Sequence, residues 1–296
     1  MLPPDGTRVS LRYRLPDGSV PPHTDVVGHL TSSGTTIDVR TRRGEVVTVA
    51  AADVLAVRVV PEQPVRTSQI RNTEHAAALA WPGSERQWLD GWLLRFGGGQ
   101  TRRANSAVPL EAWAGPGALA AITDWYAARG VPALIAVPDR LFRLPAGVAS
   151  DGENVVMTAE PHAGVPSGEV TLTARPDPAW REVYRRDVSD DVLSAVVDGE
   201  VAFATAPGVA AGRGAVTTSP DGTRWVGLSA VHVHEDARRR GSGRSICEAL
   251  LAWGAERGAT RAYVQVLSDN VAATSLYEAM GFRTQHRSRY VDASSL

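Results

Sequence analysis

The stretch Trp225–Gly243, WVGLSAVHVHEDARRRGSG, is the most informative part of the chain. Its apolar first half, WVGLSAVHV, predicts a strand, and the polar, glycine-containing second half predicts a turn. A helix is expected to begin near Gly241–Arg244, because Ile246, Leu250 and Trp253 then form one apolar stripe at i, i+4 and i+7. The stretch therefore predicts a strand, a turn and a helix that packs on a sheet.

The turn has the composition of an anion-binding loop. Gly241 and Gly243 leave room for backbone N–H groups to approach a phosphate, and the following helix adds roughly half a positive elementary charge at its N-terminus. A glycine turn flanked by solvent-exposed arginines is the structural alternative. The side chains that would add charge-assisted hydrogen bonds to a phosphate are Arg238, Arg239, Arg240 and Arg244.

The residues after this helix give the turn its context. A strand is predicted over Arg261–Leu267, and a second helix carries Tyr277 towards a Gly-Phe pair. Asn270 precedes that helix and stands seven residues before Tyr277, which is nearly two helical turns. Both side chains are therefore expected to face one cleft.

A strand, a glycine turn, a helix, a strand, an asparagine and a helical tyrosine, in this order, resemble the GNAT superfamily of acyl-CoA-dependent N-acetyltransferases. The resemblance covers roughly residues 190–290. It rests on Arg238-x-x-Gly241-x-Gly243, Asn270 and Leu276-Tyr277-Glu278-x-x-Gly281-Phe282. The whole layout also resembles a bacterial family with an N-terminal Src-homology-3-like barrel and tandem GNAT units, often labelled N-acetylglutamate synthase-like or histone-type acetyltransferases. That closer likeness is carried by Gly91–Arg95 and Thr101–Ser106.

The GNAT resemblance implies direct transfer of an acetyl group from acetyl-CoA to a primary amine. The turn would bind the diphosphate through its N–H groups, the preceding strand and Asn270 would hold the pantetheine arm, and Tyr277 would protonate the departing thiolate. An aromatic lid packed on the sheet is the alternative role for Tyr277. The implied cofactor-binding residues are Val231, His232, Val233, Arg238, Arg239, Arg240, Gly241, Ser242, Gly243, Arg244, Asn270 and Tyr277.

Two positions depart from the usual GNAT pattern. His234 stands where proline is common, and Arg239 stands where glycine is common. The Arg239 side chain is therefore expected to point outward from the turn.

The base that accepts a proton from the amine is left open. Glu200, His232 and Glu235 are the catalytic candidates, and a surface or strand-capping role is an equal alternative for each of them. His232 and His234 share one face of a strand, but no carboxylate at a suitable spacing completes a zinc site, so no metal is expected.

The expected fold class is α+β, with a small N-terminal β-barrel followed by tandem GNAT-like α/β units, in which helices flank a mixed central sheet. Five short alternating strands predict the barrel over residues 1–62, and Pro61–Pro64 is the predicted linker. Residues 66–168 are predicted to be a degenerate GNAT-like unit, and residues 169–296 the catalytic one. The argument is a weak repeat, because Pro116–Val137 and Ile246–Val266 each read as a helix, an Arg-Gly pair and a β-rich run. Any two α/β crossovers can look this alike. The first unit lacks the phosphate turn, so it is expected to shape the acceptor side of the cleft.

Composition narrows the class of protein. The 296 residues are 43% hydrophobic and 21% charged with a net charge of −1, and all 31 basic residues are arginine. This balance argues against a nucleic-acid-binding module. Cys247 is the single cysteine and is predicted to be a packing residue. The absence of a signal-like segment or a long apolar run predicts a cytoplasmic protein without a membrane span.

The sequence leaves the acceptor and the oligomeric state undetermined. A small-molecule amine and a protein lysine both fit the same cofactor half-site. The alternative to an enzyme is a catalytically silent CoA-binding or scaffold protein whose barrel recruits a protein partner. Two groups of residues from the first unit have predicted roles: Trp81, Trp88, Trp92 and Trp113 in packing, and Arg95, Arg102, Arg103 and Asn105 in packing or in binding a carboxylate-bearing acceptor.

Overall fold

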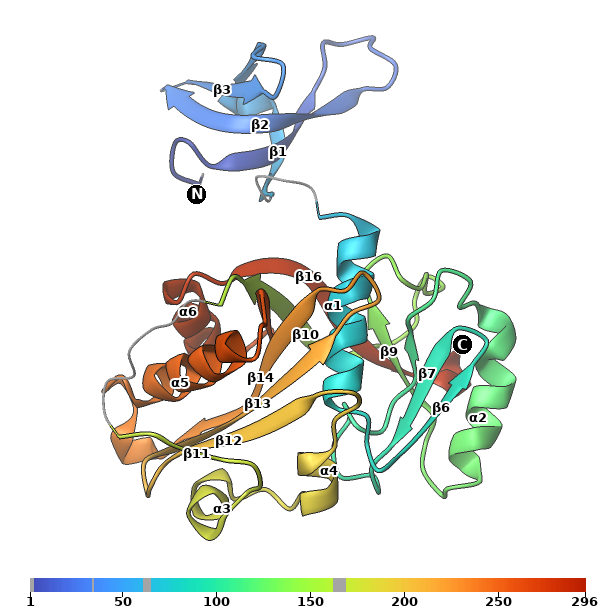
Figure 1. Ribbon diagram of the computed structural model, residues 1–296. Helices are drawn as coiled ribbons and strands as arrows, with labels where there is room; N and C mark the ends of the chain where they lie inside the picture. Colours follow the sequence, from blue (N-terminus) through green and yellow to red (C-terminus); the bar gives the residue numbers. More distant parts are fainter. Residues whose placement is uncertain (1–2, 34, 61–64, 162–168) are drawn as a thin grey trace. The chain divides into compact units, whose positions relative to one another are not determined.

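The computed structural model describes residues 3–33, 35–60, 65–161 and 169–296 (Figure 1). The chain forms two compact units, residues 1–65 and residues 66–296. The linker predicted at Pro61–Pro64 and the boundaries predicted at residues 62 and 168 fall outside the described residues. No helix in the described ranges is long and apolar enough to cross a membrane.

The first unit is a five-stranded antiparallel sheet in the order β4-β3-β2-β1-β5. The alternating sequence explains this sheet, because Val9 and Leu11 of its first strand are fully buried whereas Arg12 and Arg14 are exposed. No ladder joins β4 to β5 among the described residues, so the expected barrel is an open, barrel-like sheet. The elements are β1 (Arg8–Arg14), β2 (His23–Ser33), β3 (Thr36–Thr41), β4 (Val46–Ala50), the 3₁₀ turn η1 (Ala51–Asp53) and β5 (Val54–Val59).

The second unit is built on an eight-stranded mixed sheet in the order β11-β12-β13-β14-β15-β10-β16-β9. Only the β14–β15 pair in this sheet is parallel. The strands are β9 (Leu134–Pro138), β10 (Asp151–Ala159), β11 (Thr171–Thr173), β12 (Glu200–Ala206), β13 (Ala210–Thr218), β14 (Arg224–Val233), β15 (Arg261–Leu267) and β16 (Arg283–Asp292).

Strand β10 precedes the predicted boundary at residue 168, yet it lies between β15 and β16, which follow that boundary. It pairs with both neighbours, and its Val156 and Met157 are fully buried. The sheet of residues 169–296 is therefore completed by strands from the preceding segment, and the two predicted units share one sheet.

Helices cover both faces of this sheet (Figure 1). Alternation along β12 separates the faces, because Ala202 and Ala204 pack with α5 and α6, whereas Phe203 packs with α1, α3 and α4. Helix α5 approaches closely, since a Cβ on Gly212 of β13 would lie 2.5 Å from Ile246 Cγ2. The helices are α1 (Thr67–Ala80), α2 (Leu119–Ala127), α3 (Pro178–Tyr184), α4 (Asp190–Ser194), α5 (Ser242–Glu256) and α6 (Val271–Ala279), with 3₁₀ turns η2 (Pro116–Ala118), η3 (Glu235–Ala237) and η4 (Ala293–Ser295).

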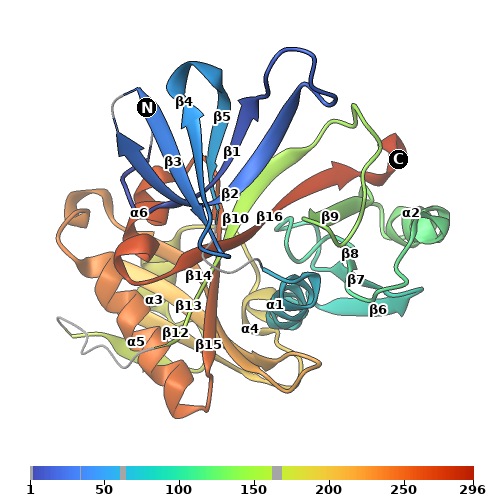
Figure 2. The same ribbon diagram turned by 90° about the horizontal axis from the view of Figure 1, so that it is seen from above.

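A small second sheet in the order β6-β7-β8 lies with α2 near β9 (Figure 2). Its strands are β6 (Glu85–Leu89), β7 (Trp92–Phe96) and β8 (Val108–Pro109). The sequence predicts a strand over Thr101–Val108, but residues 101–107 form a loop and β8 begins only at Val108. Asn105 holds this loop, because its Oδ1 accepts 2.8 Å hydrogen bonds from the N–H groups of Gly97 and Gly99.

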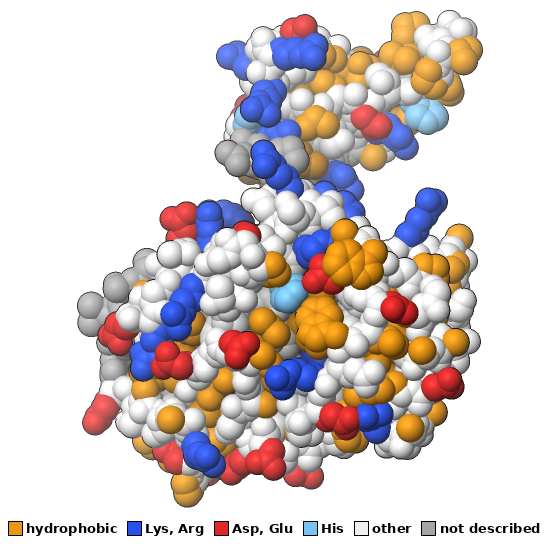
Figure 3. Space-filling view, turned by 45° about the vertical axis from the view of Figure 1, so that its right-hand side comes forward, with side chains coloured by type: hydrophobic (Ala, Val, Ile, Leu, Met, Phe, Trp, Pro, Cys, Tyr) orange, Lys and Arg blue, Asp and Glu red, His pale blue; other side chains and the backbone are white. Residues whose placement is uncertain are grey.

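The tryptophans predicted to pack divide into two pairs. Trp81 and Trp92 are buried, as expected. Trp88 and Trp113 are 46% and 71% exposed, so the packing prediction is wrong for them. Figure 3 shows hydrophobic side chains gathered among charged ones on a face of this unit.

Candidate active site

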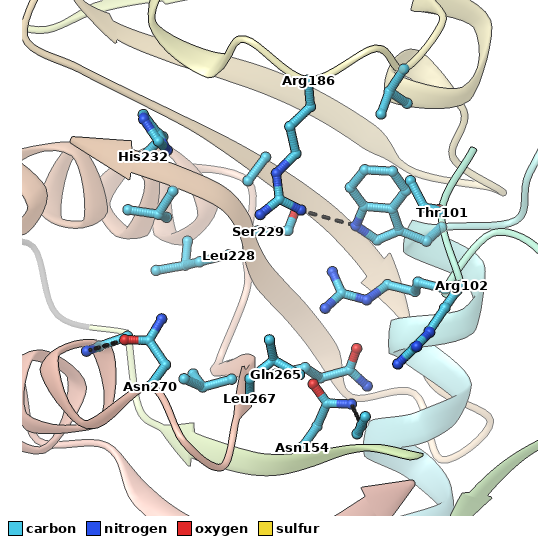
Figure 4. A pocket seen from close by; sticks show the side chains of 18 of the residues that line it. Thr101, Arg102, Asn154, Arg186, Leu228, Ser229, His232, Gln265, Leu267 and Asn270 are labelled. Carbon is cyan, nitrogen blue, oxygen red and sulfur yellow. Dashed lines mark hydrogen bonds between the residues drawn. The ribbon is translucent and has the colours of Figure 1, made fainter. Parts of the chain in front are cut away.

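A cavity of about 650 Å³ lies where β14 and β15 part (Figure 4). The two strands pair only from Trp225–Arg261 to Leu228–Val264, although both continue beyond that point. Strand β14 then bulges, because Ala230 has a φ of +52° and the β13–β14 register shifts there. Val231 and His232 near the end of β14 line the opening, and so do the last three residues of β15, residues 265–267.

The cavity has two ends that face opposite sides of the sheet. Asn270, Ala273 and Tyr277 line the end towards α5 and α6. The other end is lined by the end of α1, the loop at residues 100–103, β10 and the segment at residues 184–188. Of the residues predicted to bind the cofactor, Val231, His232, Asn270 and Tyr277 line the cavity. Val233 packs instead against the α5 core, and the turn lies beyond the cavity wall.

The turn before α5 presents free backbone donors. Within the described chain, the N–H groups of residues 239–244 donate to no protein acceptor. Gly241 precedes α5 with a φ of +87°, and the 15-residue helix directs its positive end at the turn. Arg239 is exposed and has a φ of +62°, which costs a residue with a Cβ about 1 kcal/mol. The side chain therefore points outward, as expected, and its backbone supplies the conformation that glycine supplies more cheaply.

Two of the four turn arginines already have protein partners. Arg238 Nε donates to the Val233 carbonyl at 3.3 Å, and Arg244 Nε donates to Glu248 Oε1 at 2.7 Å. Arg239 and Arg240 are exposed and make no contact of this kind in the described chain. The charge available for an anion at the turn therefore comes from the last two.

Asn270 has a structural role as well as a place at the cavity. It is the N-cap of α6, and its Oδ1 accepts a 3.1 Å hydrogen bond from the N–H of Ala273. Figure 4 shows the side chain at the edge of the cavity with its amide nitrogen directed away from this bond. The cap fixes the oxygen and leaves the NH₂ group able to donate.

Tyr277 is buried, with 5% of its surface exposed, and its ring packs edge-on against Phe282 at 5.5 Å. Burial, and next the hydrogen-bonded thiol of Cys247, raises the pKa of Tyr277 well above its ordinary value of 10. Burial also raises the pKa of Cys247 to about 12, so the thiol is an inert packing group, as predicted. The phenol is therefore a neutral hydrogen-bond donor at physiological pH.

His232 is half-buried at the same opening. Burial first, and then the charges of Arg238, Arg186 and Arg185, lower the pKa of His232 below its ordinary 6.5. Its imidazole is therefore neutral at pH 7 and able to accept a proton.

The other two base candidates lie away from the opening. Glu200 is exposed at the start of β12, where it pairs with Arg257 at 2.9 Å and with Arg224 at 3.8 Å. Glu235 is exposed in η3 and lies 3.7 Å from Arg238. Neither lines the cavity.

Sequence reasoning missed several groups that the fold brings to this site. Arg186 and Gln265 line the cavity. Beside it, the buried Glu74 Oε1 lies 2.8 Å from Nε2 of buried His286 and accepts a 3.5 Å hydrogen bond from Gln265 Nε2. Glu74 and His286 stand 212 residues apart, and nothing local to either announces the contact. Arg102 and Arg103 also line the cavity, whereas Arg95 and Asn105 are held by backbone groups nearby. Within the described ranges, no three His, Cys, Asp or Glu side chains gather as metal ligands would.

Known proteins resemble both units. A family model described as "Probable histone acetyltransferase Rv0428c C-terminal" matches residues 67–291. The Mycobacterium tuberculosis protein "Probable histone acetyltransferase Rv0428c" is 49% identical over 98% of this chain and 96% of its own length. The chain belongs to this family. It is a GNAT N-acetyltransferase, as its motifs predict.

A second family model describes the first unit, and two solved structures resemble the fold. "Rv0428c N-terminal Sm-like domain" matches residues 3–58, so the first unit is Sm-like. A "GCN5-related N-acetyltransferase" from Kribbella flavida has a TM-score of 0.53 at 16% identity, covering 78% of this chain and 96% of its own. A putative GNAT acetyltransferase from Novosphingobium aromaticivorans has a TM-score of 0.51 at 16% identity, covering 74% and 97%. Both structures share the GNAT fold with this chain.

Proposed function

We propose that this GNAT protein transfers an acetyl group from acetyl-CoA directly to a primary amine, with His232 as the base and Tyr277 as the acid. The observation that carries the proposal is the pairing of free N–H donors at residues 239–244 with a cavity that reaches Tyr277 and His232. The diphosphate would lie on the turn and the pantetheine arm along the bulged end of β14.

The two proposed proton carriers suit the reaction. The amine attacks the thioester carbonyl carbon, the C–S bond breaks, and the amine proton passes to His232, whose lowered pKa keeps it neutral. The departing thiolate takes a proton from Tyr277, which its raised pKa keeps protonated. A phenol with so high a pKa is a weak acid towards a thiolate, so we infer that proton donation accompanies C–S cleavage.

Substitution of Ser242 by aspartate is expected to weaken CoA binding about 10- to 100-fold. Ser242 is the first residue of α5, so the new carboxylate would occupy the free N–H donors and repel the diphosphate. The same charge favours the helix N-terminus, so stability is expected to rise by about 0.5 kcal/mol. Calorimetric titration with CoA and thermal unfolding measure the two effects.

Ser242→Asn is the matched control, because it changes size without adding charge. It is expected to bind CoA like the native chain. Loss of CoA affinity equal to that of the aspartate variant would show that size rather than charge matters, and would contradict a diphosphate site at the turn.

The pH profile of kcat/KM is expected to have an acidic limb with a midpoint below pH 6.5. Below its pKa, His232 is protonated and cannot accept the amine proton, so the rate falls as pH decreases. His232→Gln is expected to remove this limb. A limb that persists in the variant would assign the base to another group.

A catalytically silent CoA-binding scaffold is the second candidate. It shares the free turn donors but requires no acid or base. Release of free CoA thiol upon addition of amines separates the two functions. CoA binding without thiol release from any amine would favour the scaffold.

We also propose that residues 66–168 are a degenerate GNAT-like unit. Helix α2 is followed by Gly130 with a φ of +68° and by β9, as α5 is followed by Gly258 with a φ of +77° and by β15. This order supports a common origin. We also propose that the first, Sm-like unit binds a protein partner.

A further inference from the structure

The acceptor end of the cavity carries an unbalanced positive charge. Among the described residues that line the cavity, three are arginines, namely Arg102, Arg103 and Arg186, and one is a carboxylate, Asp187. His232 adds no charge at pH 7, because its pKa is lowered. Arg102 forms an ion pair with Asp151, so the remaining lining charges are two guanidinium groups, Arg103 and Arg186, against the one carboxylate of Asp187.

Arg103 is the most confined of these groups. Its guanidinium carbon lies 5.7 Å from the centre of the Trp81 ring, and its Nε is buried without a hydrogen-bond acceptor. It makes no ion pair within the described part of the chain. A buried guanidinium N–H without an acceptor is unfavourable, and a tryptophan face offsets only part of that cost. Because Arg103 also lines the cavity, a ligand anion there would be placed to accept hydrogen bonds from its guanidinium group.

The surrounding charges increase the effect. Buried Arg213 places its guanidinium carbon 4.3 Å from the centre of the same Trp81 ring, so a second cation stands behind the cavity wall. Figure 4 shows Arg186 reaching into the cavity towards Ser229 from the segment after α3. The buried carboxylate of Glu74 is already bound by His286. The field in this end of the cavity is therefore positive.

The position of Arg103 relates this charge to the chemistry. Arg103 and Tyr277 line the same cavity, and the charge of Arg103 lowers the pKa of Tyr277 against the larger effect of burial. Arg103 therefore shares a cavity with the proposed site of thioester cleavage. A substrate group bound by Arg103 would place its amine towards that site.

We propose that the acceptor is a primary amine that also carries an anionic group, a carboxylate or a phosphate, which Arg103 binds with Arg186 at the rim. This inference rests on the proposed function and names its substrate class. A planar guanidinium binds either anion through two parallel hydrogen bonds. Polyamines, aminoglycosides and lysine-rich protein tails are cationic and would meet like charge here.

The test compares matched amines with the full chain and acetyl-CoA, with CoA thiol release as the readout. The pairs are glycine and glycinamide, β-alanine and β-alaninamide, and phosphoethanolamine and ethanolamine, together with spermidine and a lysine-rich peptide. Rates are expressed per unprotonated amine, because the amides and acids differ in amine pKa. The anionic member of a pair is expected to have a kcat/KM about 10- to 100-fold higher than its neutral partner.

The two anionic arms identify the source of the negative charge. A preference confined to the amino acids assigns a carboxylate, and one confined to phosphoethanolamine assigns a phosphate. Arg103→Gln is expected to reduce the anionic-to-neutral ratio to about threefold or less. Arg186→Gln, at an exposed position, tests the same charge if the first variant does not fold. Arg86→Gln is the matched control, because Arg86 is exposed on β6 away from the cavity.

A binding measurement separates this inference from the proposed function. The chain is saturated with CoA, so that the turn is occupied, and is then titrated with succinate or inorganic phosphate. Anion binding that Arg103→Gln weakens supports the inference, whichever amines react. Failure of CoA to bind would overturn the proposed function. CoA binding without anion binding, or faster acetylation of spermidine or the lysine-rich peptide, would overturn the anionic acceptor and leave the transferase intact.

Discussion

Replacement of Tyr277 by phenylalanine is expected to lower kcat about 100-fold and to leave acetyl-CoA affinity within about threefold. The phenol is buried at the cavity and stays protonated, since burial and Cys247 raise its pKa. Phenylalanine keeps the edge-on packing against Phe282 and removes only the proton donor. Steady-state kinetics and calorimetric titration with acetyl-CoA measure the two quantities.

Cys247→Ala is the control for this experiment. It removes the hydrogen-bonding thiol beside the phenol and keeps the phenol itself. We expect a kcat within about threefold of the native value, with some loss of stability from the small cavity. Equal loss of kcat and of cofactor affinity in Tyr277→Phe would assign the phenol to binding, and a loss of kcat in Cys247→Ala as large as in Tyr277→Phe would assign the effect to packing.

A chain of residues 169–296 is expected not to fold, although it holds every motif of the GNAT resemblance. It lacks β10, which pairs with β15 on one side and with β16 on the other. Without β10, two strand edges lose their partners and the residues packed on Val156 and Met157 lose their cover. Losses of this size exceed the net stability of about 5–15 kcal/mol that domains possess.

A chain of residues 66–296 is the matched comparison, because it retains the whole compact second unit. It is expected to unfold in one cooperative transition, whereas residues 169–296 should show exposed hydrophobic surface and no cooperative transition. Circular dichroism during heating and gel filtration measure this difference. Cooperative unfolding of monomeric residues 169–296 would show that β10 is dispensable and would support the sequence-based boundary.

Local sequence patterns predicted the elements around the cofactor half of the site. The predicted strand at residues 261–267 has the observed bounds, and the predicted helix near Gly241–Arg244 begins at Ser242. These predictions succeed because apolar periodicity and glycine turns depend on neighbouring residues. The strand predicted at residues 101–108 is wrong, because a local side-chain interaction competes there with strand pairing. Asn105 satisfies the local backbone with its own side chain, which favours a loop over a ladder.

Local sequence patterns predicted only part of the acceptor half of the site. Arg103 lies in the Thr101–Ser106 stretch and is a sequence-based candidate for binding an anionic acceptor, whereas Arg186 and Gln265 come from two other segments without a motif around them. Glu200 stands at a plausible place in the sequence, yet β12 carries it to a surface pairing with Arg257. Whether a side chain reaches the cavity or the surface depends on the direction of its strand and on the strands that pair with it. Both depend on contacts between residues far apart in the sequence.

The amino-acid sequence by itself determined the family, the strand-turn-helix that presents free N–H groups, and the tyrosine that follows it. Tertiary structure alone decided that β10 enters the sheet of the later segment, that β14 and β15 part beyond Leu228, and that Arg103 and Tyr277 line one cavity. The physical reason is the sequence separation over which the interactions act. Backbone hydrogen bonding within a turn or helix is set by residues a few positions apart, whereas a cavity and its charge arise from packing between segments up to hundreds of residues apart.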